Sequence, residues 1–337
     1  MPSGKPIAVY FLGSGALAVP VLEGLLKDGR VRIVGIGTQP DKPAGRKRQL
    51  CPTPVGQFCA ERGLAVDKPA SVNTPEFLDR LKGLAPETVV VASFGQLLKE
   101  AILGLPSYGC LNVHASLLPR WRGASPINAA ILNGDAEAGI CFMAMDRGLD
   151  TGAVYEAWPL ALQGDETSES LERELATLAA GRIADCLESV CRGGRRPRPQ
   201  PTEGATYAAK LRKQDGIIDW NRSAADIDRQ VRGLQPWPRA GFQLETDKGP
   251  CTLQVVRAEL LKCPRPTTDT APGTILEAGN QGLVIACGQD ALRLIRVIPE
   301  GRPEMAAADF LRGARLLPGT RAKSLPAPTG ATTTAPA

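Results

Sequence analysis

The chain has 337 residues, of which 43% are hydrophobic, 22% charged and 4% aromatic, and its formal net charge is +5. This balance excludes a disordered or collagen-like chain, and the length predicts two domains because single cores stop growing near roughly 250 residues. No apolar run reaches the roughly 20 residues that span a bilayer, and the first residues lack the apolar stretch of a signal peptide, so we expect a cytoplasmic protein without membrane contact.

The first half of the chain has the pattern of an open, doubly wound α/β sheet. Apolar residues 7–12 predict a strand, Gly13-Ser14-Gly15 a turn, and the spacing of the apolar residues in 19–26 a helix. Further buried strands are predicted at 31–36, 88–92, 110–113 and 140–145. Because helix-like segments separate these runs, we expect parallel strands. A short helix is predicted from Ser125-Pro126 to Asn133-Gly134, and an apolar stripe from Leu171 to Val190 predicts one long helix.

The composition and the hydrophobic pattern of the sequence change after residue 191. Residues 192–206 are rich in Pro, Gly and Arg and lack apolar periodicity, which is typical of an interdomain linker. Beyond them, Ser223 and Asp226 form a capping pair for a helix that ends near Leu234. Several short β-like runs then predict a small closed β domain, at 252–256, 273–276, 283–286 and 292–297. We therefore divide the chain into an α/β domain (1–191), a linker (192–206), a β-barrel domain (207–322) and a disordered tail (323–337).

The cysteines and the histidine argue against metal chemistry. Nine cysteines, an odd number without a Cys-x-x-Cys pair, lie mostly in apolar stretches and are interpreted as reduced core residues. His114 is the one histidine of the sequence, too few for a His-rich centre. We expect no metal.

The positive charge is concentrated in two stretches. Residues 41–48 and residues 192–203 each carry a net charge of +3, which leaves −1 for the rest of the chain. Such runs are either solvated loops or, together, a phosphate-binding surface in two pieces.

The first turn offers a second possible function. Gly13-x-Gly15-x-x-Ala18 after a strand fits the dinucleotide-binding fingerprint. The acidic residue expected roughly 20 residues later is absent, because Thr38-Gln39 stands there. A tight strand-to-helix turn is the interpretation we favour, with NAD binding as the alternative.

Three polar residues are expected at the carboxyl end of the sheet. Asn112 and His114 are two apart on one strand and should point the same way, and Asp150 follows the next predicted strand. Open α/β sheets bind ligands at this edge. An amide, an imidazole and a carboxylate supply an oxyanion donor, a proton carrier and a group that orients it. Spacing alone leaves a structural alternative open, in which His114 caps the strand and Asp150 lies in a turn.

Residues 112–123, together with residues 146–152, resemble the signature of the formyltransferases that use 10-formyltetrahydrofolate. Five further segments resemble the methionyl-tRNA formyltransferase branch of that family, at 38–46, 206–211, 218–220, 236–238 and 271–276. The resemblance runs from about residue 7 to about residue 320. It implies a Rossmann-like formyltransferase domain followed by an OB-like β-barrel domain that holds tRNA.

The resemblance also implies a reaction, in which the formyl group of 10-formyltetrahydrofolate passes to the α-amine of methionyl initiator tRNA. Asn112 would hold the formyl oxygen, His114 would stabilise the oxyanion or relay a proton, and Asp150 would fix the imidazole and help deprotonate the amine. The folate site would be lined by Ser116, Leu117, Leu118 and Pro119. The tRNA acceptor end would meet a basic loop that contains Lys42, Arg46, Lys47 and Arg48.

Two positions depart from the family pattern. Leu17 stands where an aromatic residue helps to form the methionine pocket, and Lys47 replaces a loop glycine.

We expect a monomer. The rival hypotheses are a 10-formyltetrahydrofolate hydrolase or sugar-amine formyltransferase, an NAD-dependent oxidoreductase, and a tRNA-binding protein without activity. The basic loop and Pro236-Trp237-Pro238 argue against the first pair, because a small acceptor needs neither.

Overall fold

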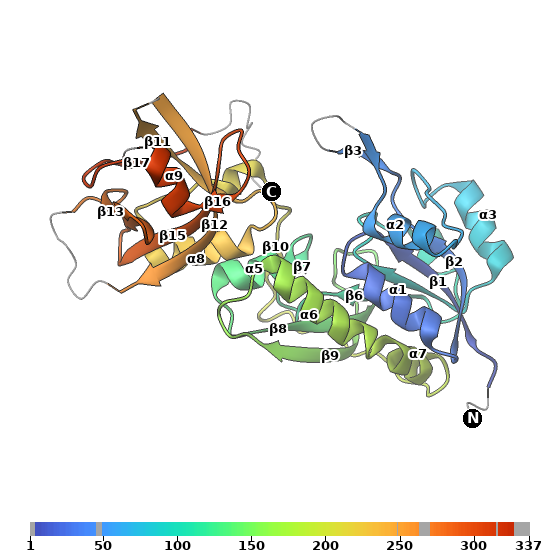
Figure 1. Cartoon of the computed structure of the whole chain (residues 1–337). Coiled ribbons are helices and arrows are strands. Elements are labelled where there is room, and N and C mark those ends of the chain that lie inside the picture. Colours follow the sequence, from blue (N-terminus) through green and yellow to red (C-terminus); the bar gives the residue numbers. More distant parts are fainter. Residues whose placement is uncertain (1–3, 45–48, 248, 263–269, 315, 327–337) are drawn as a thin grey trace. The chain divides into compact units, whose positions relative to one another are not determined.

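The computed structural model describes residues 4–44, 49–247, 249–262, 270–314 and 316–326. The chain divides into two compact units, which are described separately. The first contains residues 1–130, 136–162 and 170–209, and the second contains residues 131–135, 163–169 and 210–337. Figure 1 shows the elements of both in chain order.

The first unit is built on a six-stranded sheet in the order β2-β1-β5-β6-β8-β9. Its strands are β1 (Ile7–Gly13), β2 (Val31–Gly37), β5 (Thr88–Ala92), β6 (Cys110–His114), β8 (Glu137–Ala144) and β9 (Val154–Ala161). β1, β2, β5 and β6 are parallel to their neighbours in this group, and β1 is buried along its whole length. The expected open sheet is confirmed for these strands.

The outer half of the sheet differs from the prediction. β8, expected to be parallel, pairs antiparallel with β6, and β9, which was not predicted, pairs antiparallel with β8. The expectation of a parallel strand at 140–145 was therefore wrong. A parallel neighbour needs a crossover that returns the chain to the opposite edge of the sheet. Between β6 and β8 the chain instead forms a loop and the short helix α5 (Pro126–Asn133), which is only about 12 Å long.

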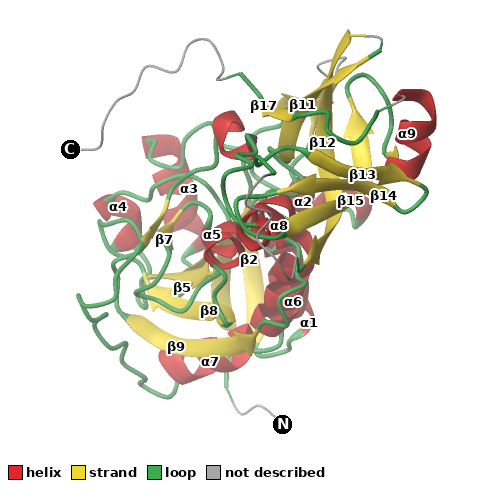
Figure 2. Ribbon diagram, turned by 90° about the vertical axis from the view of Figure 1, so that its left-hand side faces the viewer, coloured by secondary structure: helices red, strands yellow, loops and turns green. Residues whose placement is uncertain are grey.

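Helices cover both faces of this sheet (Figure 2). The helices of this part are α1 (Ala18–Lys27), α2 (Pro54–Glu61), α3 (Pro75–Leu84), α4 (Glu100–Leu103), α6 (Ser168–Ala180) and α7 (Ile183–Cys191). Tyr10 and Leu12 of β1 pack in one cluster with residues of α3 and α4, whereas α1 and α7 contact each other and β1. The doubly wound prediction is confirmed.

The apolar stripe from Leu171 to Val190 belongs to two helices rather than one. α6 ends at Ala180 and α7 begins at Ile183, so Gly181 and Arg182 interrupt the predicted long helix. Glycine is a poor helix former, and the break at Gly181 lets each segment bury its own apolar face.

The second unit is a curled antiparallel sheet. Its path is β13-β14-β15-β12-β11-β17, and the short β16 (Met305–Ala306) also pairs with β15. The strands are β11 (Ala240–Thr246), β12 (Gly249–Leu261), β13 (Ile275–Gly279), β14 (Gly282–Ala286), β15 (Ala291–Pro299) and β17 (Ala322–Ser324). An isolated antiparallel bridge between Thr274 and Arg321 joins the two ends of this path, so the sheet closes on itself. The predicted closed β domain is confirmed.

Helices α8 (Ala224–Gly233) and α9 (Ala307–Ala314) and the 3-10 turn η1 (Lys213–Gly216) complete this unit. The Ser223 hydroxyl caps α8 by accepting from the Asp226 N–H at 3.1 Å, as predicted. The rings of Trp220 and Phe242 pack edge to face in the core, with 5.1 Å between their centroids. Of the predicted tail, residues 327–337 lie outside the described residues, and Lys323 and Ser324 belong to β17.

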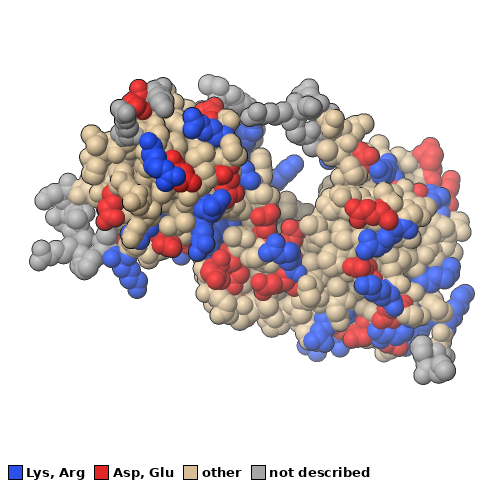
Figure 3. Space-filling model, in the orientation of Figure 1, with Lys and Arg blue, Asp and Glu red and all other residues tan. Residues whose placement is uncertain are grey.

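Figure 3 shows acidic and basic side chains interspersed on the face that it draws of each unit. Within the described residues, no helix is both long and apolar enough to cross a bilayer.

Candidate active site

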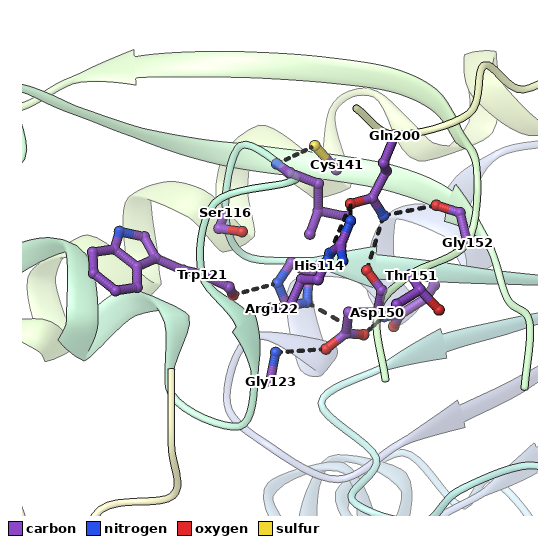
Figure 4. Close-up of polar contacts among 12 residues, drawn as sticks. His114, Ser116, Trp121, Arg122, Gly123, Cys141, Asp150, Thr151, Gly152 and Gln200 are labelled. Atoms are coloured by element: carbon purple, nitrogen blue, oxygen red, sulfur yellow. Dashed lines mark hydrogen bonds and ion pairs between the residues drawn. The ribbon is translucent and has the colours of Figure 1, made fainter. Parts of the chain in front are cut away.

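The site lies at the carboxyl end of β6, where Asn112 and His114 occupy alternate positions of the strand. The loop after β8 brings Asp150 to them (Figure 4). Asn112 Nδ2 donates to Asp150 Oδ1 at 3.2 Å, and His114 Nδ1 lies 3.7 Å from the same oxygen. The structure therefore brings together the three side chains that the sequence places at this edge.

The Asp150 carboxylate accepts a further hydrogen bond, and the Asp150 backbone has a left-handed conformation. Its Oδ2 accepts from the backbone N–H of Gly123 at 2.8 Å. Its backbone has a φ of 53°, in the left-handed region, where aspartate is among the few non-glycine residues found. This conformation turns the carboxylate back toward β6.

His114 is 5% exposed, and a hydrogen bond holds its ring at Nε2. Nε2 lies 3.0 Å from the backbone oxygen of Trp121. A carbonyl oxygen can only accept, so Nε2 carries a hydrogen. Nδ1 is consequently the nitrogen that gains or loses a proton, and it faces Asp150.

The loop after β6 contains the four residues predicted to line a folate site. The Ser116 hydroxyl donates to Arg120 O at 2.6 Å, which ties the loop to itself. Leu117 packs over β8, where a Cβ on Gly139 would lie 2.5 Å from Leu117 Cδ2. Leu118 and Pro119 are half-buried. All four residues thus flank the site, and their role toward folate stays a prediction.

One buried thiol also borders this loop. Leu118 N donates to Cys141 Sγ at 3.3 Å. Burial raises the pKa of the Cys141 thiol to about 11. Cys141 therefore stays a neutral thiol near pH 7 and acts as a structural acceptor rather than a nucleophile.

The basic loop is a hairpin. β3 (Lys42–Ala44) pairs antiparallel with β4 (Gln49–Cys51), and Figure 1 shows β3 projecting from the body of the first unit. Lys42 is exposed, whereas Arg46, Lys47 and Arg48 lie outside the described residues. Asp41, the acidic residue of this stretch, is ion-paired with Lys68 at 2.6 Å. The binding role of the four basic residues stays a prediction.

The first turn is packed as a strand-to-helix connection. A Cβ on Gly13 would lie 2.5 Å from the Phe11 ring, so close packing requires glycine there. Leu17, 1% exposed, donates its N–H at the start of α1 to Glu172 Oε1 at 3.1 Å. A carboxylate from the chain thus lies where a dinucleotide phosphate would sit. This favours the turn interpretation over NAD binding.

Several residues that hold the site were not among the predicted site residues. Gln200 donates to the carbonyl oxygens of Asp150 and Gly152, and Thr206 Oγ1 accepts from Trp121 N at 2.9 Å. β7 (Arg122–Gly123) pairs with β10 (Tyr207–Ala208) beside the loop. Gln200 and Thr206 lie in the segment interpreted as a linker, and its Pro- and Arg-rich composition gives no signal of these contacts.

Gly123→Ala should damage the site through the backbone. Gly123 has a φ of 110°, and an added Cβ would lie 2.7 Å from Ala208 O. The strain should lower the free energy of unfolding by about 1–3 kcal/mol and withdraw the N–H that holds Asp150. Thermal denaturation measures the first effect and turnover of the folded fraction the second. Unchanged values for both would show that the loop tolerates the side chain.

Comparison with known proteins agrees with this architecture. Residues 5–185 match the family "Formyl transferase", and residues 210–315 match "Formyl transferase, C-terminal domain". The fold and the site thus define a formyl transferase.

Relatives narrow the family. The methionyl-tRNA formyltransferase of Citrifermentans bemidjiense is 40% identical over 311 residues, which cover 92% of this chain and 95% of the relative. That of Xylella fastidiosa is 42% identical over 309 residues, 91% of this chain and 97% of the relative. The chain belongs to the methionyl-tRNA formyltransferase family.

A solved structure supports the fold. The N-formyltransferase of Helicobacter canadensis, described in complex with folinic acid and dTDP-3-aminofucose, superposes with a TM-score of 0.60. It is 15% identical, and the match covers 86% of this chain and 99% of that one. At this identity the likeness concerns the fold alone. Among the residues that the structure describes, no group of three or more His, Cys, Asp and Glu side chains could hold a metal ion.

Proposed function

We propose that this chain transfers the formyl group of 10-formyltetrahydrofolate to the α-amino group of methionyl initiator tRNA. The observation that carries the proposal is that Asn112, His114 and Asp150 lie together at the carboxyl end of β6. Asp150 Oδ1 is 3.2 Å from Asn112 Nδ2 and 3.7 Å from His114 Nδ1. Family membership over more than nine-tenths of the chain supports the same reaction.

The reaction is an acyl transfer to an amine. The amine nitrogen forms a bond to the formyl carbon, and the bond from that carbon to the folate nitrogen breaks. The amine loses one proton, and the folate nitrogen that leaves gains one. Free α-amines titrate near roughly 7.7 to 8.0, so a useful fraction of the acceptor is neutral at pH 7 and a mild base is sufficient. The protein must therefore stabilise the oxyanion and move one proton.

Asn112 and His114 are suited to the oxyanion. Asn112 uses one N–H toward Asp150, and its amide has a second that can donate to the formyl oxygen. Because Nε2 of His114 is bonded to Trp121, the ring acts through Nδ1. A proton held there between His114 and Asp150 can stabilise the developing negative charge and pass to the leaving nitrogen.

Asp150 combines two tasks. Its carboxylate orients the imidazole and, with its negative charge, favours removal of the proton from the attacking amine. Two N–H donors converge on the carboxylate, from the Asn112 amide and the Gly123 backbone, and His114 Nδ1 lies 3.7 Å away. Such convergence fixes the geometry before substrate binds, which is how a site lowers the barrier without reorganisation.

The hairpin formed by β3 and β4 is proposed to meet the acceptor end of the tRNA through Lys42, Arg46, Lys47 and Arg48. Lysine and arginine attract phosphates by displacing their counterions. Asp41, the acidic residue that precedes the hairpin, is ion-paired with Lys68. The barrel of the second unit is proposed to hold the tRNA arm, as in the family.

Arg46→Ala should mainly weaken the use of tRNA. Loss of one phosphate contact should lower kcat/KM for methionyl-tRNA about 10-fold and reduce the slope of log(kcat/KM) against log[salt] by about 1. Steady-state assays over a range of salt measure both. Lys82→Ala removes an exposed lysine from α3 and is the matched control. An Arg46→Ala enzyme that behaves like the control would make the hairpin a solvated surface.

We also propose that the enzyme acts as a monomer in the cytoplasm, with 10-formyltetrahydrofolate as formyl-donor substrate and without a metal. The site supports the monomer, since all three proposed catalytic residues come from one chain. The acceptor supports the compartment, because charged tRNA is a substrate of translation.

The test is the identity of the product. Purified protein is mixed with formyl-labelled 10-formyltetrahydrofolate and methionyl initiator tRNA, and the amino acid is then released from the tRNA by mild base. The proposal predicts labelled formylmethionine, and none when the tRNA is uncharged. Label that stays on the folate, or that appears on uncharged tRNA, would refute it.

A further inference from the structure

Residues 198–208, which we call the strap, comprise most of the predicted linker and the first two residues of the predicted β-barrel domain. They are bonded to both loops of the site. Arg198 and Val154 exchange backbone hydrogen bonds of 2.8 Å at the start of β9. Further along, Arg122 N donates to Thr206 O, and Ala124 N donates to Ala208 O. The strap therefore joins the loop after β6 to the loop after β8.

Gln200 is the centre of these contacts (Figure 4). Its Nε2 donates to Asp150 O at 2.8 Å and to Gly152 O at 2.7 Å. Its Oε1 accepts from Arg122 Nε at 3.0 Å and from Arg122 Nη2 at 2.8 Å. Both amide hydrogens and both lone pairs of the oxygen are used, so the partners fix the orientation of the amide.

These bonds act on the backbone that carries the proposed catalytic carboxylate. Asp150 has a positive φ, a conformation that surrounding contacts must maintain. Gln200 binds the carbonyl of Asp150 itself and that of Gly152, two residues later. Arg122, 9% exposed, anchors Gln200, and the next residue, Gly123, binds the Asp150 carboxylate directly. The Arg122-Gly123 strand thus holds Asp150 twice, once directly and once through Gln200.

We propose that Gln200 is a positioning residue for Asp150. It touches no reacting atom, and it sets the distance from the carboxylate to His114 and Asn112 by clamping the backbone on which Asp150 is carried. This inference rests on the proposed function and adds a residue to it. A displacement of about 1 Å in a reacting group can cost on the order of 100-fold in rate, so the clamp should affect turnover.

Two substitutions separate positioning from mere stabilisation. Gln200→Leu removes all four hydrogen bonds, whereas Gln200→Glu keeps an acceptor for Arg122 but cannot donate to the two carbonyl groups. The matched control is Gln230→Leu in the second unit. Gln230, 4% exposed, likewise donates to two carbonyl oxygens, those of Asp215 and Ile217, at 2.7 and 3.0 Å.

The experiment measures kcat for formyl transfer and the KM values for 10-formyltetrahydrofolate and for methionyl-tRNA. Thermal denaturation gives the melting temperature of each variant. Both Gln200 variants should lose 10- to 100-fold in kcat, with KM values within about twofold of the wild type. Gln230→Leu should lower the melting temperature without changing kcat of the folded enzyme. If Gln200→Leu does not fold, Gln200→Glu decides.

Wild-type kcat in Gln200→Glu would overturn the proposal, because a carboxylate cannot replace the two N–H donors. A loss confined to KM or to melting temperature would also overturn it. If the wild-type protein itself formylates no methionyl-tRNA, the proposed function fails instead, so the two failures are distinct.

Discussion

Replacing His114 by alanine should lower kcat for formyl transfer about 10²- to 10⁴-fold, the range typical for loss of an acid or base group. The substitution removes Nδ1, the nitrogen that faces Asp150 at 3.7 Å and that must carry the mobile proton because Nε2 is bonded to Trp121. Binding of tRNA should change little, since the ring is buried. Rapid-quench formation of formylmethionyl-tRNA measures the first quantity and filter binding the second.

A structural cost must be separated from this effect. His114→Ala removes the hydrogen bond between Nε2 and the Trp121 carbonyl oxygen, which costs about 0.5–1.5 kcal/mol of stability. His114→Gln has an amide that can donate to this carbonyl but no ring nitrogen that can take up a proton and pass it on, so it should be more stable than the alanine variant and equally slow. Near-normal turnover in either variant would remove His114 from the mechanism.

Asp150→Asn should reduce kcat by a similar factor, about 10²- to 10⁴-fold. Asparagine tolerates the left-handed backbone at this position as well as aspartate does, so the loop should keep its conformation. It can still accept from Gly123, but it loses the negative charge beside His114 and sets its own amide against that of Asn112. Single-turnover rates with saturating donor isolate this chemical step.

The control for the charge change is Asp79→Asn, on the exposed surface of α3. It removes one negative charge from the same unit and should leave the single-turnover rate unchanged. A rate for Asp150→Asn within threefold of this control would mean that Asp150 only orients the loop, which is the structural alternative that sequence spacing left open.

The strands that form continuous apolar runs could be predicted from the sequence. The elements whose position or direction depends on tertiary contacts could not. β1, β5 and β6 are buried on both faces and read as continuous apolar runs. β9 lies at the sheet edge, has half-buried and exposed positions but no buried one, and was not predicted. The direction of β8 and the break at Gly181 depend on how the chain returns to the sheet, which an apolar pattern does not encode.

The site divides in the same way. Asn112 and His114 could be paired because alternate residues of a strand share a face. Asp150 was placed near them on the premise that β8 is parallel to β6, but β8 is antiparallel and its end lies beside Leu111 at the start of β6. It is the loop after β8 that carries Asp150 to Asn112, so the expected proximity is right and its reason was wrong. The family resemblance supplied their roles. Gln200 and the Trp121 carbonyl could not be found, since one lies between prolines in a segment without periodicity and the other is a backbone group.

The preference of the enzyme among acceptors tests the central claim most directly. Labelled 10-formyltetrahydrofolate is offered to methionyl initiator tRNA, free methionine, an amino sugar nucleotide and water under identical conditions, and kcat/KM is measured for each. The account predicts rapid transfer to methionyl-tRNA and at least 10³-fold slower transfer to every other acceptor, since a small acceptor makes no phosphate contacts, each of which contributes to binding. Faster transfer to the amino sugar, or release of labelled formate to water, would contradict it.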